Sequence, residues 1–184
     1  MPRSRTATPK VSVIILNWNG KKFLKDCFTS LRRVQYAPLE VILVDNNSSD
    51  DSVAYVRTHF PWVTVVANKT NTGFARGNNI GYRKSSGTYL LFLNNDTQVP
   101  PTFLDGLVRD MERDATIGCI QPQMRIMSSP QLQDEAGGYL TNAGVVYHYG
   151  YRKKHALPIY RKRREVFSAK GACMLLPRDV FAKV

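Results

Sequence analysis

The sequence predicts a single α/β domain with a mostly parallel β-sheet flanked by helices on both faces. Short runs of almost continuous apolar residues recur along residues 11–126, and strands buried on both faces have this character. Longer stretches with helical periodicity lie between the runs. Regular alternation of strand and helix produces parallel strands joined by right-handed crossovers. Together these observations predict the fold class.

The expected strands are the apolar runs, and the expected helices are the periodic stretches between them. Ser49 and Asp50 suit the cap and first turn of the second helix, and Pro100-Pro101 suit the opening of the fourth. The expected strands are Val11–Leu16, Val41–Val44, Val63–Ala67, Tyr89–Leu93 and Ile117–Ile120. The expected helices are Lys21–Val34, Ser52–Phe60, Phe74–Ser85 and Thr102–Arg113.

Beyond residue 127 the periodicity weakens into a stretch rich in Gly, Tyr and Pro. We interpret this stretch as a long excursion of the same domain. An apolar run returns at Ala172–Leu176, and Pro177-Arg178-Asp179 opens a helix that runs to Val184. The expected organisation is a basic tail at residues 1–10 followed by one domain at 11–184.

Composition restricts the class of protein. The chain has 184 residues, a formal net charge of +12 and 43% hydrophobic residues, which excludes a disordered chain. Its apolar runs are too short for a spanning helix, and the N-terminus lacks a signal-peptide pattern. The expected location is therefore the cytoplasm. Cys27, Cys119 and Cys173 form no C-x-x-C pair, and we expect three buried thiols.

Small polar residues follow four successive expected strands. The carboxyl ends of parallel strands share one edge of a sheet, where α/β proteins bind ligands. One such cluster is ordinary turn chemistry, whereas four on one edge predict a binding site. The clusters are Asn17 to Gly20, Asp45 to Ser48, Asn68 to Gly73 and Asn94 to Thr97.

The absence of two sequence motifs narrows the range of possible ligands. No G-x-G-x-x-G follows the first strand and no G-x-x-x-x-G-K-[ST] occurs, so a dinucleotide fold and a P-loop ATPase lack their phosphate cradle. Gly73, Gly77 and Gly81 recur every four residues, which places them on one helical face. This spacing predicts close packing of the helix, with Gly73 at its start able to admit a ligand.

Three residues in these clusters have alternative interpretations. Asp45 can accept a hydrogen bond from the N3–H of uracil or thymine, or form an Asx-turn or helix cap. Trp18 can stack on a nucleobase or cover the edge of the core. Asp96 is the best candidate ligand for Mg²⁺ or Mn²⁺, which prefer oxygen, or it belongs to a turn before Pro100.

Five ordered sequence blocks carry a family resemblance: VSVIILNWN at 11–19, VILVDNNSSD at 41–50, NTGFA with NNIG within 71–81, LNNDT at 93–97 and GACMLL at 171–176. On these blocks the chain resembles the inverting glycosyltransferases of family 2, which have the GT-A nucleotide-diphospho-sugar transferase fold. The Asn-Asn-Asp of the fourth block and Ala136-Gly137-Gly138 resemble the rhamnosyltransferase-type branch.

The resemblance implies roles for particular residues. It places residues 16–19 under the nucleobase, makes Asp45 the base-recognition acid and sets Asp96 where the family's D-x-D motif stands. Asn94 replaces the first Asp of that motif, which leaves one carboxylate for Mg²⁺ or Mn²⁺. The expected donor-binding residues are Leu16, Asn17, Trp18, Asn19, Asp45, Asn47, Gly73, Phe74, Asn78, Asn79, Asn95 and Asp96, and the acceptor-side residues are Gly171 and Ala172.

The implied activity is transfer of a sugar, with inversion, from a UDP- or dTDP-sugar to a saccharide or lipid-linked acceptor in cell-surface polysaccharide synthesis. Residues 11–126 would be the nucleotide-sugar-binding half and 127–184 an incomplete acceptor-side half. The family's catalytic base follows the Gly-Ala block by a few tens of residues, beyond Val184. We assign the role of catalytic base to neither Asp134 nor Asp179. Asp179 suits the cap at the opening of a helix. We therefore expect the donor-binding part of a longer enzyme; the alternative is a nucleotide-sugar-binding fragment without turnover.

The basic residues are concentrated in two segments. Residues 1–10 hold three and residues 151–165 hold seven, against Glu165 alone, which accounts for +9 of the +12 charge. A nucleic-acid partner is not expected, because aromatic residues flank the second segment without interleaving with it. Arg152 to Arg164 can contact the donor diphosphate, a phosphate-bearing lipid acceptor or an anionic membrane at its inner face; a solvated arm is the alternative.

Overall fold

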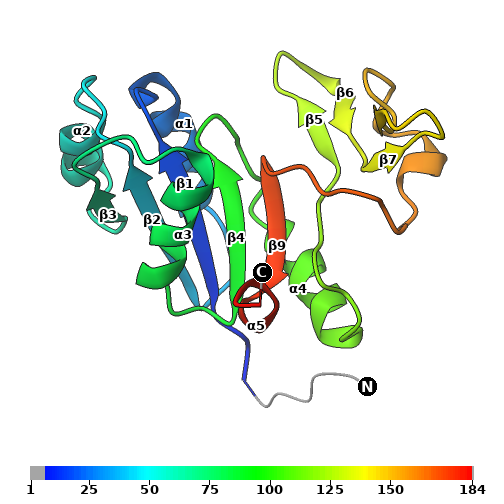
Figure 1. Ribbon diagram of the computed structural model, residues 1–184, viewed down its shortest axis with the longest axis horizontal. Helices are drawn as coiled ribbons and strands as arrows, with labels where there is room; N and C mark the ends of the chain where they lie inside the picture. The colour runs from blue at the N-terminus through cyan, green and yellow to red at the C-terminus, as the bar shows by residue number, and fades with distance from the viewer. Residues whose placement is uncertain (1–6, 184) are drawn as a thin grey trace.

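The computed structural model describes residues 7–183 and is centred on a five-stranded sheet of order β3-β2-β1-β4-β9 (Figure 1). The first four strands are parallel, and β9 is antiparallel to β4. The strands are β1 (Val11–Asn17), β2 (Leu39–Asp45), β3 (Thr64–Ala67), β4 (Tyr89–Asn94) and β9 (Cys173–Pro177). The predicted mostly parallel sheet is therefore confirmed.

Helices cover both faces of the sheet, as predicted. Alternate residues of β1 belong to different clusters: Val13 packs in a core with α1, α2 and α4, whereas Ile14 packs with α3 and α5. This two-sided burial explains why the strands are apolar without interruption. The helices are α1 (Lys21–Arg32), α2 (Ser52–His59), α3 (Phe74–Lys84), α4 (Phe103–Arg113) and the single-turn α5 (Arg178–Phe181).

The glycines of α3 let this helix approach the sheet closely. A Cβ atom at Gly81 would lie 2.4 Å from Ile14 Cγ2, and one at Gly77 would lie 2.4 Å from Leu16 Cδ1. Gly73 precedes the helix with a φ of 77°, a backbone conformation that residues other than glycine rarely adopt. The predicted close packing of the glycine face is confirmed.

The expected strand at Ile117–Ile120 is wrong. Only Ile120 pairs, through one isolated bridge to Leu175 in β9. The edge of β4 is occupied by β9, a strand from the other end of the chain, so the earlier apolar run lies outside the ladder. The closing helix is also shorter than expected, because α5 ends at Phe181. Val184 lies outside the described residues, as does most of the basic tail.

Residues 124–168, which include the start of the excursion expected after residue 127, fold into two small antiparallel ladders, which we call the hairpin lobe. One ladder pairs β5 (Met124–Ile126) with β6 (Ser129–Glu135), and the other pairs β7 (Gly138–Leu140) with β8 (Val146–His148). Figure 1 shows the lobe beside the sheet, beyond β9. A 3₁₀ turn, η1 (Pro158–Tyr160), lies in the return to β9.

Burial of the thiols differs from the expectation at one position. Cys27 and Cys173 are buried, but Cys119 is exposed because its segment did not join the sheet. Burial raises the pKa of the Cys27 and Cys173 thiols to about 12. Within residues 7–183, no helix has both the length and the apolar character needed to cross a membrane.

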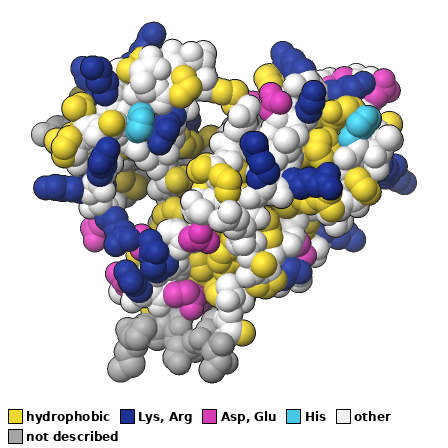
Figure 2. All heavy atoms as spheres, turned by 180° about the vertical axis from the view of Figure 1, so that it is seen from behind, with side chains coloured by type: hydrophobic (Ala, Val, Ile, Leu, Met, Phe, Trp, Pro, Cys, Tyr) yellow, Lys and Arg dark blue, Asp and Glu magenta, His cyan; other side chains and the backbone are white. Residues whose placement is uncertain are grey.

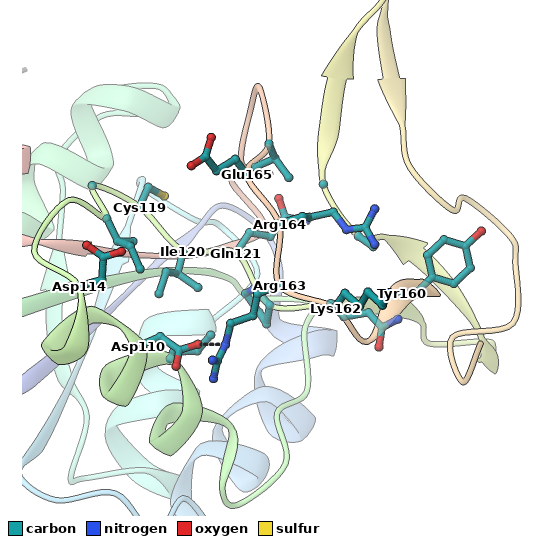
Figure 3. A pocket seen from close by; sticks show the side chains of 18 of the residues that line it. Asp110, Asp114, Cys119, Ile120, Gln121, Tyr160, Lys162, Arg163, Arg164 and Glu165 are labelled. Atoms are coloured by element: carbon teal, nitrogen blue, oxygen red, sulfur yellow. Dashed lines mark ion pairs between the residues drawn. The ribbon is translucent and has the colours of Figure 1, made fainter. Parts of the chain in front are cut away.

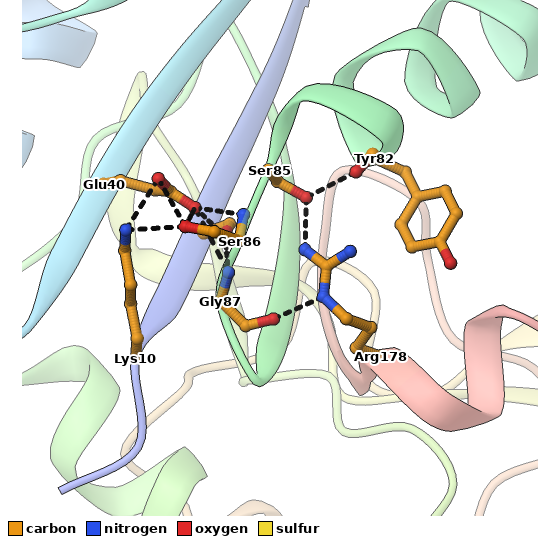
Figure 4. A network of polar contacts seen from close by, with 8 residues as sticks. Lys10, Glu40, Tyr82, Ser85, Ser86, Gly87 and Arg178 are labelled. Carbon is orange, nitrogen blue, oxygen red and sulfur yellow. Dashed lines mark hydrogen bonds and ion pairs between the residues drawn. The ribbon is translucent and has the colours of Figure 1, made fainter.

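A polar network closes the amino ends of the strands (Figure 4). Glu40 accepts hydrogen bonds from Ser86 N at 2.6 Å and from Ser12 Oγ, and its Oε2 lies 2.8 Å from Lys10 Nζ. Arg178 donates from Nε to Gly87 O and so ties the start of α5 to the same turn. Burial alone would raise the pKa of Glu40, but the bonds from Lys10, Ser12 and Ser86 lower it to about 2.

Glu40 gives a pH-dependent prediction. Its folded pKa is depressed, so its contribution to stability is complete above its ordinary pKa of 4.5 and disappears as the pH falls towards about 2. Glu40→Gln should lower the free energy of unfolding at pH 7 by about 1–3 kcal/mol. Urea titrations should show this deficit shrinking towards zero near pH 2, whereas the exposed control Glu165→Gln changes little at any pH. A deficit independent of pH would contradict the assignment.

Candidate functional site

The four predicted polar clusters meet at one edge of the sheet, which we call the rim. Asn17 at the end of β1 pairs with Asp45 at the end of β2, and Asp45 pairs with Ala67 at the end of β3. Asn94 ends β4 beside Leu16. The arrowheads of these parallel strands point to the same edge in Figure 1. The structure thus brings together the loops that sequence reasoning selected.

Asn17 joins three of these strands through its buried side chain. Its Nδ2 donates to Asp45 Oδ2 at 2.8 Å, and its Oδ1 accepts from Asn95 Nδ2 at 2.7 Å. A Cβ atom at Gly20 would lie 2.2 Å from Asn95 Nδ2, so only glycine leaves room for this bridge. The bond between Asn17 and Asn95 therefore holds the loops after β1 and β4 together. Both side chains are used in hydrogen bonds within the protein.

Asp45 is buried and closes its own loop. Its Oδ1 accepts from Ser48 N at 2.8 Å, and its Oδ2 accepts from Ser48 Oγ at 2.7 Å as well as from Asn17. The turn role that the sequence left open is therefore present. A carboxylate offers about four acceptor positions, and these three bonds leave one of them on Oδ1. Recognition of a base by Asp45 stays a prediction.

Asn46 is a site residue that sequence reasoning did not single out. Its buried Nδ2 donates to Gly73 O at 3.1 Å, and its Oδ1 accepts from Asn68 Nδ2 at 2.8 Å and Thr72 Oγ1 at 3.0 Å. This one side chain fixes the loop that leads into α3. The sequence contained one indication of this role, the position of Asn46 directly after Asp45. Each of its hydrogen-bond partners is at least 22 residues away in the sequence.

The remaining predicted donor residues divide into two groups. In the first group the side chains make contacts within the protein, and its members are Leu16, Asn19 and Asn78. Leu16 packs beneath Gly77. Asn19 Oδ1 accepts a hydrogen bond from Ser49 N at 2.8 Å, and Asn78 Nδ2 donates one to Phe74 O at 3.1 Å. The others present their side chains to solvent. Trp18 is 60% exposed and Phe74 56%. The exposed group is Trp18, Asn47, Phe74, Asn79 and Asp96.

The predicted acceptor-side residues lie at the same rim. Ala172 O accepts a hydrogen bond from Asn94 N at 2.9 Å, which ties the entry to β9 to the end of β4. A Cβ atom at Gly171 would lie 3.7 Å from Cζ of the Phe74 ring. Gly171 and the Phe74 ring thus lie next to each other, although nearly one hundred residues separate them in the sequence.

A charged cluster adjoins Gly171, and sequence reasoning missed most of it. Lys170 forms an ion pair with Asp134 and lies 3.9 Å from Glu135 Oε2. Glu135 is buried, and His148 Nδ1 lies 2.9 Å from its Oε2. Asp134, which was not nominated as a base, is therefore engaged by Lys170. Asp179 lies in the first turn of α5 without a side-chain capping bond.

Asp96 is the rim carboxylate that we predict as the ligand of a divalent cation. Asp96 is exposed near the start of the loop after β4, two residues beyond the end of the strand. Among residues 7–183, no group of three or more His, Cys, Asp or Glu side chains has the geometry to hold a metal ion. Mg²⁺ is commonly bound by one or two carboxylates together with substrate phosphates. Asp96 fits that shared mode and does not by itself form a complete metal site.

The sheet order, the antiparallel strand beyond β4 and the polar rim define the GT-A fold, the architecture of nucleotide-diphospho-sugar transferases. The chain belongs to glycosyl transferase family 2, whose model matches residues 12–184. The predicted family is therefore confirmed, while the rhamnosyltransferase-type branch and the inverting mechanism remain predictions.

Similar proteins cover different shares of the chain. The O-antigen biosynthesis protein RfbC of Myxococcus xanthus is 28% identical over an alignment of 186 residues, gaps included, that covers 95% of this chain and 14% of that protein. An uncharacterized glycosyltransferase of Haemophilus influenzae is 34% identical over 110 residues, 60% of this chain and 37% of that one. The chain spans less than half the length of these relatives.

Solved structures support the fold. GalNAc-T7 with UDP, GalNAc and Mn²⁺ matches 97% of this chain and 37% of its own, with a TM-score of 0.75 and 18% identity, which concerns the fold alone. The mannosyltransferase PcManGT from Pyrobaculum calidifontis, in complex with GDP-Man and Mn²⁺, matches 65% of this chain and 37% of its own. Its TM-score is 0.57 and its identity 26%.

Proposed function

We propose that this domain binds a UDP- or dTDP-sugar and transfers the sugar, with inversion, to a saccharide or lipid-linked acceptor in cell-surface polysaccharide synthesis. One observation carries the proposal. The network around Asn17 holds the loops after β1, β2 and β4 together while Trp18, Phe74 and Asp96 stay exposed above it. A rigid floor with exposed stacking and charged groups suits a nucleotide ligand.

Each part of the donor has a partner at the rim. Trp18 offers an aromatic face for the base, and the remaining acceptor position of Asp45 suits the N3–H of uracil or thymine. The N-terminus of the 11-residue α3 presents free backbone N–H groups and a positive dipole end for the diphosphate. Gly73 leaves open space there, because a Cβ atom at its position would meet nothing within 4 Å.

The group transfer needs charge neutralisation and an acceptor. Asp96 would ligate Mg²⁺ or Mn²⁺, and such a cation neutralises charge on a departing nucleoside diphosphate. The Mn²⁺ in PcManGT and GalNAc-T7 supports this choice of cofactor. Gly171 lies beside the Phe74 ring and Ala172 beside the end of β4, and the two residues suit the acceptor side. We place the reaction in the cytoplasm at the inner face of the membrane, where the basic segment between Arg152 and Arg164 would face anionic lipid.

Two measurements test the proposal. Isothermal titration with UDP, dTDP and GDP in the presence of Mn²⁺ should show binding of the first two and weaker binding of GDP, whose base lacks the pyrimidine edge that Asp45 suits. Incubation with labelled UDP- and dTDP-sugars and membrane lysate should release the free nucleotide. Binding without release would favour the alternative of a nucleotide-sugar-binding fragment, and the absence of nucleotide binding would refute both.

Asp96→Asn is the direct test of the metal ligand. We expect the variant to lose at least about tenfold of the Mn²⁺-dependent affinity for UDP or dTDP, because one carboxylate contact to the cation disappears. Affinity measured in EDTA should stay unchanged. Asp105→Asn is the matched control, since Asp105 is an exposed carboxylate on α4 nine residues further along the chain. Equal Mn²⁺ dependence in both variants would exclude Asp96 as the ligand.

A further inference from the structure

Exposed apolar side chains are concentrated on the hairpin lobe and the segment that follows it. Among the described residues, eight of the thirteen large hydrophobic side chains that are exposed lie between residues 140 and 167. Isolated exposed apolar residues are normal on a protein surface, but a concentration of them marks an interaction surface. The eight are Leu140, Val145, Val146, Tyr147, Tyr151, Leu157, Ile159 and Phe167.

The β7–β8 hairpin carries three of these side chains at its tip. Leu140 pairs with Val146 across the ladder, so their side chains share one face. Val145 lies in the turn between them, which the bond from Thr141 N to Val145 O closes at 2.9 Å. The three side chains are 47%, 44% and 61% exposed for Leu140, Val146 and Val145. Phe167 stands beside the base of the hairpin through its bond to Gly138 O.

Positive charge is concentrated in the segment that follows the hairpin. The segment from Arg152 to Glu165 carries seven cations and one acid. Arg163 Nε lies 2.6 Å from Asp110 Oδ2 on α4, as Figure 3 shows, and the Arg164 guanidinium lies 4.4 Å from the centre of the Tyr149 ring. These two anchors fix the segment against the domain, which argues against the solvated-arm alternative.

The other five cations face solvent. They make no side-chain ion pair or hydrogen bond within the described part of the chain. In Figure 2 the hairpin lobe lies at the left, and Lys and Arg side chains alternate there with hydrophobic ones. The free cations are Arg152, Lys153, Lys154, Arg161 and Lys162.

We propose that the hairpin lobe docks onto an anionic phospholipid surface, with the hairpin tip entering the interface and the five free cations facing the headgroups. Apolar insertion together with attraction to anionic lipid is the combination that gives peripheral proteins stable membrane binding. An acidic protein would satisfy the cations but leaves the three tip side chains unexplained. Single-stranded nucleic acid needs several aromatic platforms between the cations, and Tyr160 is the one Phe, Tyr or Trp between Arg152 and Lys162.

Docking in this way has a consequence for the rim. Lys170 follows the lobe and pairs with Asp134 on β6, and Gly171 then faces Phe74. The lobe therefore adjoins the proposed acceptor side, so a lipid-linked acceptor in the same bilayer would be presented next to it. The docking itself is independent of sugar transfer, because it requires no nucleotide.

Vesicle binding of the full chain tests the proposal. The probes are vesicles of phosphatidylcholine alone and vesicles containing about 30% phosphatidylglycerol, an anionic lipid that attracts basic segments. Co-sedimentation should detect binding only to the anionic vesicles, and the binding should weaken as salt rises. Absence of binding to anionic vesicles, or equal binding to neutral ones, would overturn the proposal. Displacement from the vesicles by single-stranded RNA at equal phosphate concentration would overturn it in favour of nucleic acid.

Two variants separate the charged and apolar contributions. Arg161→Gln with Lys162→Gln should lower the partition coefficient about 25-fold, since each cation near the surface contributes about fivefold. Val145→Ser with Val146→Ser should lower it at least about tenfold and leave its salt dependence intact. Matched controls on α1 are Lys22→Gln with Lys25→Gln and Phe23→Ser, all at exposed positions. Losses of equal size in the controls would overturn the assignment to the lobe.

Discussion

Asp45→Ala is expected to lower the free energy of unfolding by about 2–4 kcal/mol and to abolish nucleotide binding. The substitution removes three hydrogen bonds at once, one buried and two partly buried, and leaves Ser48 N without its acceptor. A donor that loses its partner costs desolvation energy to the extent that it is buried. Asn17 also loses its bond to Asp45, which weakens the connection between the loops after β1 and β2. Urea unfolding and titration with UDP or dTDP measure the two effects.

Stability and binding are separable in this experiment. Binding is measured at a temperature where circular dichroism shows the variant to be folded, so that lost affinity reports the site. Asp105→Ala serves as the stability control, because this exposed carboxylate in the first turn of α4 contributes only about 0.3–1 kcal/mol. A free energy of unfolding within about 0.5 kcal/mol of the wild type would contradict the role given to Asp45.

Gly81→Val is expected to lower the free energy of unfolding by about 3 kcal/mol. The added Cβ would lie 2.4 Å from Ile14 Cγ2 and 3.1 Å from Val44 Cγ2, which are side chains of the packed strands β1 and β2. Relief requires α3 to move off the sheet, and that movement carries Gly73 and the expected diphosphate position with it. Affinity for UDP or dTDP should therefore fall together with stability.

Gly106→Ala is the matched control with the opposite sign. Gly106 is also a helical glycine, but a Cβ atom there would meet only the end of the Arg109 side chain, at 3.9 Å. Replacing glycine by alanine in an open helical position should raise the free energy of unfolding by about 0.4–1 kcal/mol. Thermal unfolding of both variants measures the contrast. A Gly81 variant as stable as the Gly106 variant would refute close packing of α3.

Local pattern was sufficient for most of the elements. The apolar runs of β1, β2 and β4 and the periodic stretches of α1 to α4 lie where the sequence predicts them, with differences of a few residues at their ends. The run at Ile117–Ile120 has the same apolar character but forms no strand. Its place beside β4 was taken by β9, and competition between two distant segments for one edge leaves no local trace.

The sequence also located the site, but it did not show which of its residues support the loops and which face the ligand. Polar clusters after successive strands predict a shared rim, because parallel strands end at the same edge. Whether a polar residue in such a cluster supports the loops or faces the ligand depends on contacts across the fold. Asn17 and Trp18 are neighbours in the sequence, yet one is buried among hydrogen bonds and the other is exposed.

The sequence by itself determined the α/β class, the four parallel strands, the close-packed glycine face of α3 and the family. These features rest on residue periodicity, conformational freedom and ordered motifs, which are properties of neighbouring residues. Only the tertiary structure decided that Asn95 reaches Asn17 across 78 positions, that Gly171 faces Phe74 and that the hairpin lobe combines an apolar tip with free cations. The physical reason is that hydrogen bonding and burial depend on distances in space, which the folded chain sets between segments far apart in sequence.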